Sequence, residues 1–162
     1  MLERAGAHAF RYNLHEGSPL QMQWLFYGQS ELPVAVQAWE LPPGGFEGMH
    51  SHAEPDRPLE EIYVVTAGTG QMTVDGHVYP VSAGDAVLAR VGTEHDLRNT
   101  GDEPLKVLVI WGEPGSADYS SFGSAKRALA ARTEADEATD GHRTSQVASA
   151  SSASSRRGPD IV

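Results

Sequence analysis

The chain has no cysteine, so it can form neither a disulfide bond nor a thiolate zinc site. Lysine and arginine are scarce, with 12 residues against 22 aspartates and glutamates, and the net charge is −10. No apolar run approaches the length of a membrane span, and the first residues lack the apolar core of a signal peptide. We therefore expect a cytoplasmic protein with no membrane partner.

The acidic excess lies in residues 1–115, which hold 16 acidic and 6 basic side chains, whereas residues 116–162 hold 6 of each. A surface this acidic repels a phosphate backbone, so we expect no nucleic-acid partner. The sequence also shows no pair of helices of the DNA-binding kind.

Residues 20–113 alternate short runs of β-branched and aromatic residues with glycine, proline and aspartate. Many short strands at close spacing predict an all-β sandwich or barrel. The Asp75-Gly76 pair predicts a tight hairpin with a type I′ turn. The clearest expected strands are residues 23–27, 34–41, 62–66, 71–74, 86–89 and 105–111.

The composition changes after Trp111. Residues 124–138 are rich in alanine, leucine and charged residues, which predicts one short C-terminal helix. The last part is rich in serine, alanine and arginine and cannot bury enough apolar surface to offset the entropy of ordering, so we expect a disordered tail. The expected organisation is an N-terminal arm (1–20), a barrel (21–115), a segment with the helix (116–139) and the tail (140–162).

Three histidines and a glutamate form the strongest candidate for a functional site: His50, His52, Glu61 and His95. Imidazole nitrogens and a carboxylate oxygen are good ligands for a divalent first-row metal. Residues i and i+2 of an extended strand point to the same face, so His50 and His52 can converge on one ion from a single strand.

The spacing around these residues resembles the two sequence motifs of the cupin family. In the first, five residues separate Gly44 from His50, and six separate Glu61 from Gly68. In the second, Gly84, Gly92, His95 and Asn99 fall in register, and Arg90 stands where the motif has proline.

The resemblance implies a cupin fold, a double-stranded β-helix or jelly-roll barrel with a metal inside. It implies one divalent ion, which could be iron, manganese, nickel or zinc, held by His50, His52, Glu61 and His95. The four motif glycines would be turn residues, and Asn99 would be structural.

The sequence departs from the first motif in the segment before the acid, where Ala53 to Glu60 is longer than usual. Glu54 and Glu60 are therefore competing ligands, but Glu61 has the expected distance to Gly68. This insert joins two ligand-bearing segments and contains two prolines, so it is either a lid or specificity loop or a tolerated surface insertion.

If Glu61 faces the interior, strand alternation places Tyr63, Val65, Val107, Val109 and Trp111 inside as well. We predict that Tyr63, Trp39 and Trp111 line the substrate pocket, with core filling as the alternative. Arg90 is predicted to bind a substrate carboxylate through its guanidinium, and the alternative is a surface ion pair with Glu94 or Asp96.

Four carboxylates near the expected mouth of the barrel disfavour a highly anionic substrate unless a metal offsets their charge. They are Glu47, Glu54, Asp56 and Glu60.

Four protein ligands on an octahedral ion leave two positions open, which is typical of a catalytic site. The ligand set is close to that of non-haem iron oxygenases, so we favour a dioxygenase, an oxidoreductase acting on a small organic molecule, with Glu61 also able to move a proton. The alternatives are an isomerase, cyclase or lyase that uses the ion as a Lewis acid, and a non-catalytic binding protein.

Expected strands such as 34–41 and 105–111 carry apolar residues on both faces. The inward face fills the barrel, whereas outward residues such as Ile62, Val64, Leu108 and Ile110 need another cover. We therefore expect a homodimer that buries them across a two-fold interface.

Overall fold

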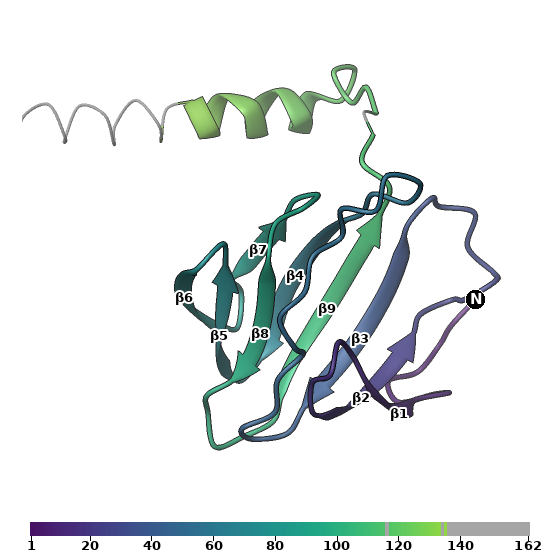
Figure 1. Cartoon of the computed structure of the whole chain (residues 1–162). Helices are drawn as coiled ribbons and strands as arrows, with labels where there is room; N and C mark the ends of the chain where they lie inside the picture. The colour runs from purple at the N-terminus through teal and green to yellow at the C-terminus, as the bar shows by residue number, and fades with distance from the viewer. Residues whose placement is uncertain (116, 134, 136–162) are drawn as a thin grey trace, which may run out of the picture. The chain divides into compact units, whose positions relative to one another are not determined.

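The computed structural model describes residues 1–115, 117–133 and 135 (Figure 1). Residues 1–115 form one compact unit, and residues 123–133 and 135 are helical. The tail predicted at 140–162 lies outside the described residues. No helix in the described part of the chain is long and apolar enough to cross a membrane.

The strands are β1 (Phe10–Asn13), β2 (Pro19–Trp24), β3 (Ala35–Leu41), β4 (Glu60–Ala67), β5 (Thr69–Val74), β6 (His77–Ser82), β7 (Ala86–Ala89), β8 (His95–Asn99) and β9 (Leu105–Gly112).

The strands form two antiparallel sheets. The larger sheet has the order β1-β2-β3-β9-β4-β7, and the smaller has the order β6-β5-β8. Figure 1 shows the smaller sheet beside the β4 and β7 edge of the larger one. The architecture confirms the predicted all-β jelly-roll fold followed by a short C-terminal helix.

The strand boundaries correct two expectations near the N-terminus. The strand predicted at 23–27 ends at Trp24, because Phe26 adopts the left-handed conformation with φ 53°. β1 was not predicted, because it has only four residues and all of them are exposed. β1 pairs with β2 in the larger sheet, so the predicted boundary at residue 20 falls inside β2.

The predicted hairpin at Asp75-Gly76 is confirmed. The two residues have φ values of 46° and 77°, as a type I′ turn requires, and Val74 pairs with His77. The motif glycines at 44, 68, 84 and 92 also have positive φ, as expected of turn residues. At Gly68 a side chain would in addition approach the Pro104 carbonyl oxygen to 2.7 Å.

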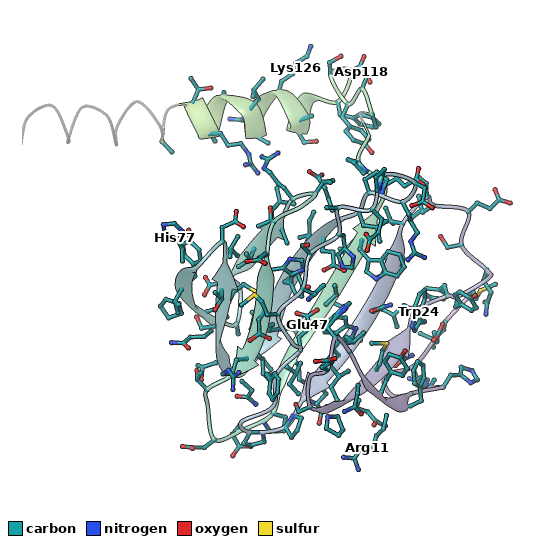
Figure 2. All side chains as sticks on the ribbon, in the orientation of Figure 1. Arg11, Trp24, Glu47, His77, Asp118 and Lys126 are labelled. Carbon is teal, nitrogen blue, oxygen red and sulfur yellow. The ribbon has the colours of Figure 1, made fainter. Side chains whose placement is uncertain are left out.

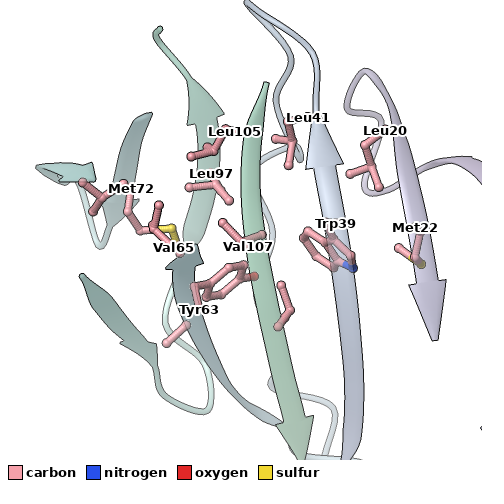
Figure 3. Packing of buried hydrophobic residues seen from close by; sticks show 13 residues of the cluster. Leu20, Met22, Trp39, Leu41, Tyr63, Val65, Met72, Leu97, Leu105 and Val107 are labelled. Atoms are coloured by element: carbon pink, nitrogen blue, oxygen red, sulfur yellow. The ribbon is translucent and has the colours of Figure 1, made fainter. Parts of the chain in front are cut away.

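The core lies between the two sheets and follows strand alternation (Figure 3). Tyr63, Val65, Val107 and Val109 are each at most 3% exposed, which confirms that they share the inward face with Glu61. Met72 and Leu97 enter the same core from the smaller sheet. The register that positions the candidate site is therefore the one expected from the sequence.

The N-terminal arm covers part of the outer face of the larger sheet. Gln23 is 3% exposed although it points outward from β2. Its side-chain amide donates to Glu3 Oε1 and to the Arg4 carbonyl, and its Oε1 accepts from the Gly6 amide. One glutamine thus fixes the arm to the sheet.

Candidate metal centre

An irregular segment brings the ligands of the first motif to those of the second. Residues 45–50 run beside β8 and form isolated bridges with it, Phe46 with Arg98 and His50 with His95. His50 and His95 exchange two backbone hydrogen bonds of 3.0 and 2.8 Å. This direct opposition places two imidazoles from distant parts of the sequence side by side.

The prediction that His50 and His52 sit on a regular strand is wrong. Residues 51–59 form no strand, and His50 belongs only to an isolated bridge. Two glycines with positive φ, Gly44 and Gly48, bend the chain just before the histidines. The rings nevertheless converge, with centroids 4.8 Å apart.

Four side chains meet in the interior as predicted. The candidate ligand atoms of His50, His52, Glu61 and His95 all lie within 4.8 Å of one another. Glu61 is at the centre: its Oε2 lies 2.9 Å from His95 Nε2 and 3.8 Å from His50 Nε2, and its Oε1 lies 3.6 Å from His52 Nε2. The competing acids Glu54 and Glu60 belong to no such cluster within the described residues.

The ring orientations fit a bound cation. His50 Nδ1 lies 2.9 Å from the Gly48 carbonyl oxygen, and His95 Nδ1 lies 2.8 Å from that of Thr93. Each Nδ1–H therefore donates to a backbone carbonyl, which leaves the Nε2 lone pair facing the carboxylate of Glu61. Two acceptors can face each other at 2.9 Å only with a proton or a metal cation between them.

Two of the candidate ligand atoms have carboxylate oxygens near them only at 3.6 to 3.8 Å. His50 Nε2 and His52 Nε2 are buried and make no hydrogen bond within the described part of the chain. Buried polar atoms without a partner are costly, and a divalent ion would satisfy both. The donor set contains only nitrogen and oxygen, which suits iron, manganese, nickel or zinc.

A buried chain of acid groups leads away from the cluster. The Tyr63 hydroxyl lies 2.6 Å from Glu61 Oε2 and 2.9 Å from Glu47 Oε1. Burial, together with the nearby charge of Glu61, raises the pKa of Glu47 well above its usual range. Burial also acts to raise the pKa of Glu61, but polar contacts with His50, His95 and Tyr63 outweigh it and hold that pKa below its usual range. The pKa values of the two acids are thus shifted in opposite directions, and the Tyr63 hydroxyl lies between their carboxyl groups.

Glu47 is the clearest functional candidate that the sequence misplaced. We expected it among the carboxylates at the mouth, but it is 1% exposed and lies inside the barrel (Figure 2). The N-terminal hairpin is packed tightly over it, because a side chain at Gly17 would overlap the Glu47 carbonyl. No sequence pattern signals a buried acid in an irregular segment.

His15 also lies at the site without any motif to mark it. It occupies the turn between β1 and β2, and its ring stacks on that of His50 with a centroid distance of 3.5 Å and an interplanar angle of 7°. Burial and the proximity of His50 lower the pKa of His15 to about 4. Burial likewise lowers the pKa of His52, so both rings stay neutral at physiological pH.

A cavity of about 400 Å³ opens beside the cluster, and the candidate ligands His52 and Glu61 line it. Trp39 and Trp111, two of the residues predicted to bind substrate, form part of its wall. Its other lining residues are Phe10, Tyr12, Leu14, His15, Met22, Trp24, Gln37, Glu47, Arg57 and Leu59.

Two predicted substrate residues lie elsewhere. Tyr63 is 1% exposed and contacts Glu61 from behind the cavity wall. Arg90 is exposed and does not line this cavity. The insert, in contrast, contributes Arg57 and Leu59 to the wall, which places part of it at the entrance.

Comparisons with known proteins agree with the fold. Residues 37–111 match the family model described as "Cupin domain". The chain is 40% identical over 68 residues to the mannose-1-phosphate guanylyltransferase of Escherichia coli, a match that covers 42% of this chain and 14% of that protein. It is 33% identical over 79 residues to a dimethylsulfoniopropionate lyase of Ruegeria pomeroyi, covering 48% of this chain and 36% of the lyase. The chain thus spans well under two thirds of either curated relative.

Among solved structures, one of the most similar is described as a predicted oxalate decarboxylase from Thermotoga maritima. The two chains superpose with a TM-score of 0.62 at 25% identity, over 70% of this chain and 100% of the other.

Proposed function

We propose that this chain, a small cupin domain protein with its family match at residues 37–111, is a metal-dependent enzyme acting on a small organic molecule. The observation that carries the proposal is the opening of the histidine and glutamate cluster onto the cavity, where both His52 and Glu61 line the wall. A structural metal site is closed by protein ligands, whereas a catalytic site keeps positions accessible to substrate. A cavity of about 400 Å³ also falls within the size range of small-molecule sites.

A divalent ion held by His50, His52, Glu61 and His95 would supply either Lewis-acid polarisation of a substrate oxygen or a binding position for dioxygen. Other groups of the protein orient the candidate ligands and line the cavity. The carbonyls of Gly48 and Thr93 fix the orientation of two imidazoles. A bound substrate that fills the mostly apolar cavity would displace water and so strengthen electrostatic interactions inside.

The contacts of Tyr63 favour proton-transfer chemistry, as in a lyase or isomerase. Its hydroxyl connects Glu61, at the cavity, to the buried acid Glu47. A carboxylate backed by a second proton carrier can accept a proton from a substrate and return it. The similarity to a lyase and to a protein described as a predicted decarboxylase supports the same class.

Oxygenation is the second candidate. It rests on the ligand set, which contains the two histidines and one carboxylate of non-haem iron oxygenases together with a third histidine. The dioxygenase and oxidoreductase prediction from the sequence therefore stays a prediction, and consumption of dioxygen would decide in its favour.

The metal is tested first, by elemental analysis of protein purified without oxygen. We expect one divalent ion per chain. Glu61→Gln should lower metal affinity more than about tenfold, since it removes a charged ligand. Glu60→Gln is the matched control, because Glu60 lies on the same strand and faces the opposite side. Equal affinity in both variants would contradict the ligand assignment.

The reaction is tested with protein loaded with Fe(II) or Mn(II) and a panel of hydroxy, keto and aromatic acids. Conversion without dioxygen, lost in Tyr63→Phe at unchanged metal content, would establish the proton-transfer class. Conversion that consumes dioxygen would establish the oxygenase. Tight binding of a panel member with no turnover under either condition would show a non-catalytic binding protein.

A further inference from the structure

The wall of the cavity beside the metal centre is apolar and aromatic over most of its area. Its tryptophans come from three strands, Trp24 from β2, Trp39 from β3 and Trp111 from β9. Trp24 and Trp111 pack edge to face with ring centroids 5.5 Å apart, which fixes the orientation of both. Such a wall favours a ligand with an apolar or aromatic part, but it does not indicate which polar group the ligand carries.

Arg57 indicates what kind of polar group the ligand carries. Among the residues that line the cavity, it is the one arginine or lysine. Its side chain takes part in no ion pair, hydrogen bond or ring contact within the described part of the chain, while its backbone amide donates to the Glu54 carbonyl at 3.0 Å and closes the turn that presents it. A guanidinium without a partner at the edge of an apolar cavity is available to an external anion.

The insert fixes Arg57 near the metal centre through its attachments. It leaves the ligand His52 and returns to the ligand Glu61, so both of its ends are held at the cluster. Leu59 is 9% exposed and anchors the returning end in the cavity wall. Pro55 and Pro58 flank the arginine and reduce the conformational freedom of the loop.

We propose that Arg57 binds the carboxylate of an organic acid whose apolar or aromatic part fills the tryptophan-lined cavity and reaches the metal centre. This inference rests on the proposed function in naming the substrate class of that same site. A planar guanidinium donates two parallel hydrogen bonds to a carboxylate, and the aromatic wall contributes area and shape. The insert is then a specificity loop.

Two features of the structure support an anionic ligand where the sequence argued against one. Of the four carboxylates expected at the mouth, only Glu47 lines the cavity, and it is 1% exposed. The others, Glu54, Asp56 and Glu60, are absent from the wall of this cavity. The role predicted for Arg90 is filled by a different arginine, because Arg90 lies outside the cavity.

The test is calorimetric titration with 3-phenylpropanoate and its neutral amide, using zinc-loaded and metal-free protein. We expect the acid to bind at least about tenfold tighter than the amide in both forms, as for a hydrogen-bonded charged pair. Arg57→Ala should remove this preference, and Arg57→Lys should restore part of it. Arg11→Ala is the matched control, because Arg11 is exposed on β1 and points away from the sheets (Figure 2); it should leave the preference unchanged.

Three results would overturn the proposal. The first is equal affinity for acid and amide in the unmodified chain. The second is a preference that survives Arg57→Ala and disappears without metal, since the ion itself would then select the carboxylate. The third is loss of the preference in Arg90→Ala with Arg57→Ala unaffected. Failure of the proposed enzymatic function would appear separately, as absence of turnover while the Arg57-dependent preference in metal-free protein remains.

Discussion

The same strands build both ends of the barrel interior, yet the two ends have opposite character. Along β4 the inward positions run from Glu61 through Tyr63 to Val65, and along the neighbouring β9 they run from Trp111 to Leu105. One end holds the charged cluster and the cavity. The other is a close-packed apolar core that includes Leu41 and Leu105, both 0% exposed.

Tyr63 forms the boundary between the two ends. Its ring packs edge to face against Trp39 in the core, with centroids 6.0 Å apart, while its hydroxyl bonds to Glu61. The apolar end supplies stability through burial, and the polar end holds groups that folding alone leaves poorly satisfied. The rigid core can therefore hold the ligands in place before any ion binds.

The largest effect is expected when histidines of the polar end are replaced, because metal binding should then be lost. Replacing His50 and His95 together by alanine should reduce metal from one ion per chain to none, a loss above about 100-fold in affinity, since even outer-shell changes reach that size. Inductively coupled plasma analysis measures the metal, and circular dichroism checks that the apolar end still folds. An ion retained by the double variant would place the site elsewhere.

The reciprocal change weakens the apolar end. Leu105→Ala should lower the free energy of unfolding by about 2–5 kcal/mol, because it leaves a cavity among fully buried neighbours. Denaturant titration measures this loss. Metal stoichiometry of the folded protein should stay at one, and loss of metal under native conditions would show that the two ends are not separable.

The buried acid gives a smaller effect that depends on pH. The pKa of Glu47 is raised in the folded chain, so above its unfolded pKa the unfolded state ionises while the folded state keeps the proton. Stability from this group is thus present at low pH and falls as pH rises, by about 1.4 kcal/mol per pH unit between the two values. The Glu47→Gln variant should have the same free energy of unfolding as the wild type near pH 4 and a higher one at pH 7. A gain that is the same at both pH values would contradict the assignment.

Changes on the outer face of the larger sheet are expected to affect the barrel interior least. Ile62 and its cross-strand partner Leu88 are 42% and 40% exposed, and we propose that a second copy of the chain covers them. Light scattering should give about twice the chain mass of 17.4 kDa. Ile62→Lys should give a monomer with unchanged metal content. A monomeric wild type would show that this face is left open.

Much of the candidate metal site could be predicted from the sequence, because the information that specifies it is local. The six-residue spacing from Glu61 to Gly68 and the alternation along β4 indicated Glu61 as the candidate ligand acid, and burial confirmed which residues share its face. The positive φ at Asp75 and Gly76 was likewise expected from the residue types alone.

The sequence did not identify the residues that surround the ligands. Glu47, His15 and Arg57 lie in irregular segments or turns, where neither alternation nor motif spacing says which way a side chain points. Their positions depend on contacts between distant segments, such as the hairpin turn at Gly17 packed over residues 46–48. Arg90 shows the same limit, since its place in the motif predicted a role that its exposed position does not support.

By itself the sequence determined the all-β class, most of the central strands with their inward face, and the four candidate ligands, because these depend on periodicity and on backbone preferences of neighbouring residues. Only the tertiary structure decided that a buried acid backs Glu61, that a histidine stacks on His50 and that the insert places an arginine in the cavity wall. Those features arise from packing between loops. Loop packing minimises buried unpaired groups and voids across the whole chain, and no local pattern records its outcome.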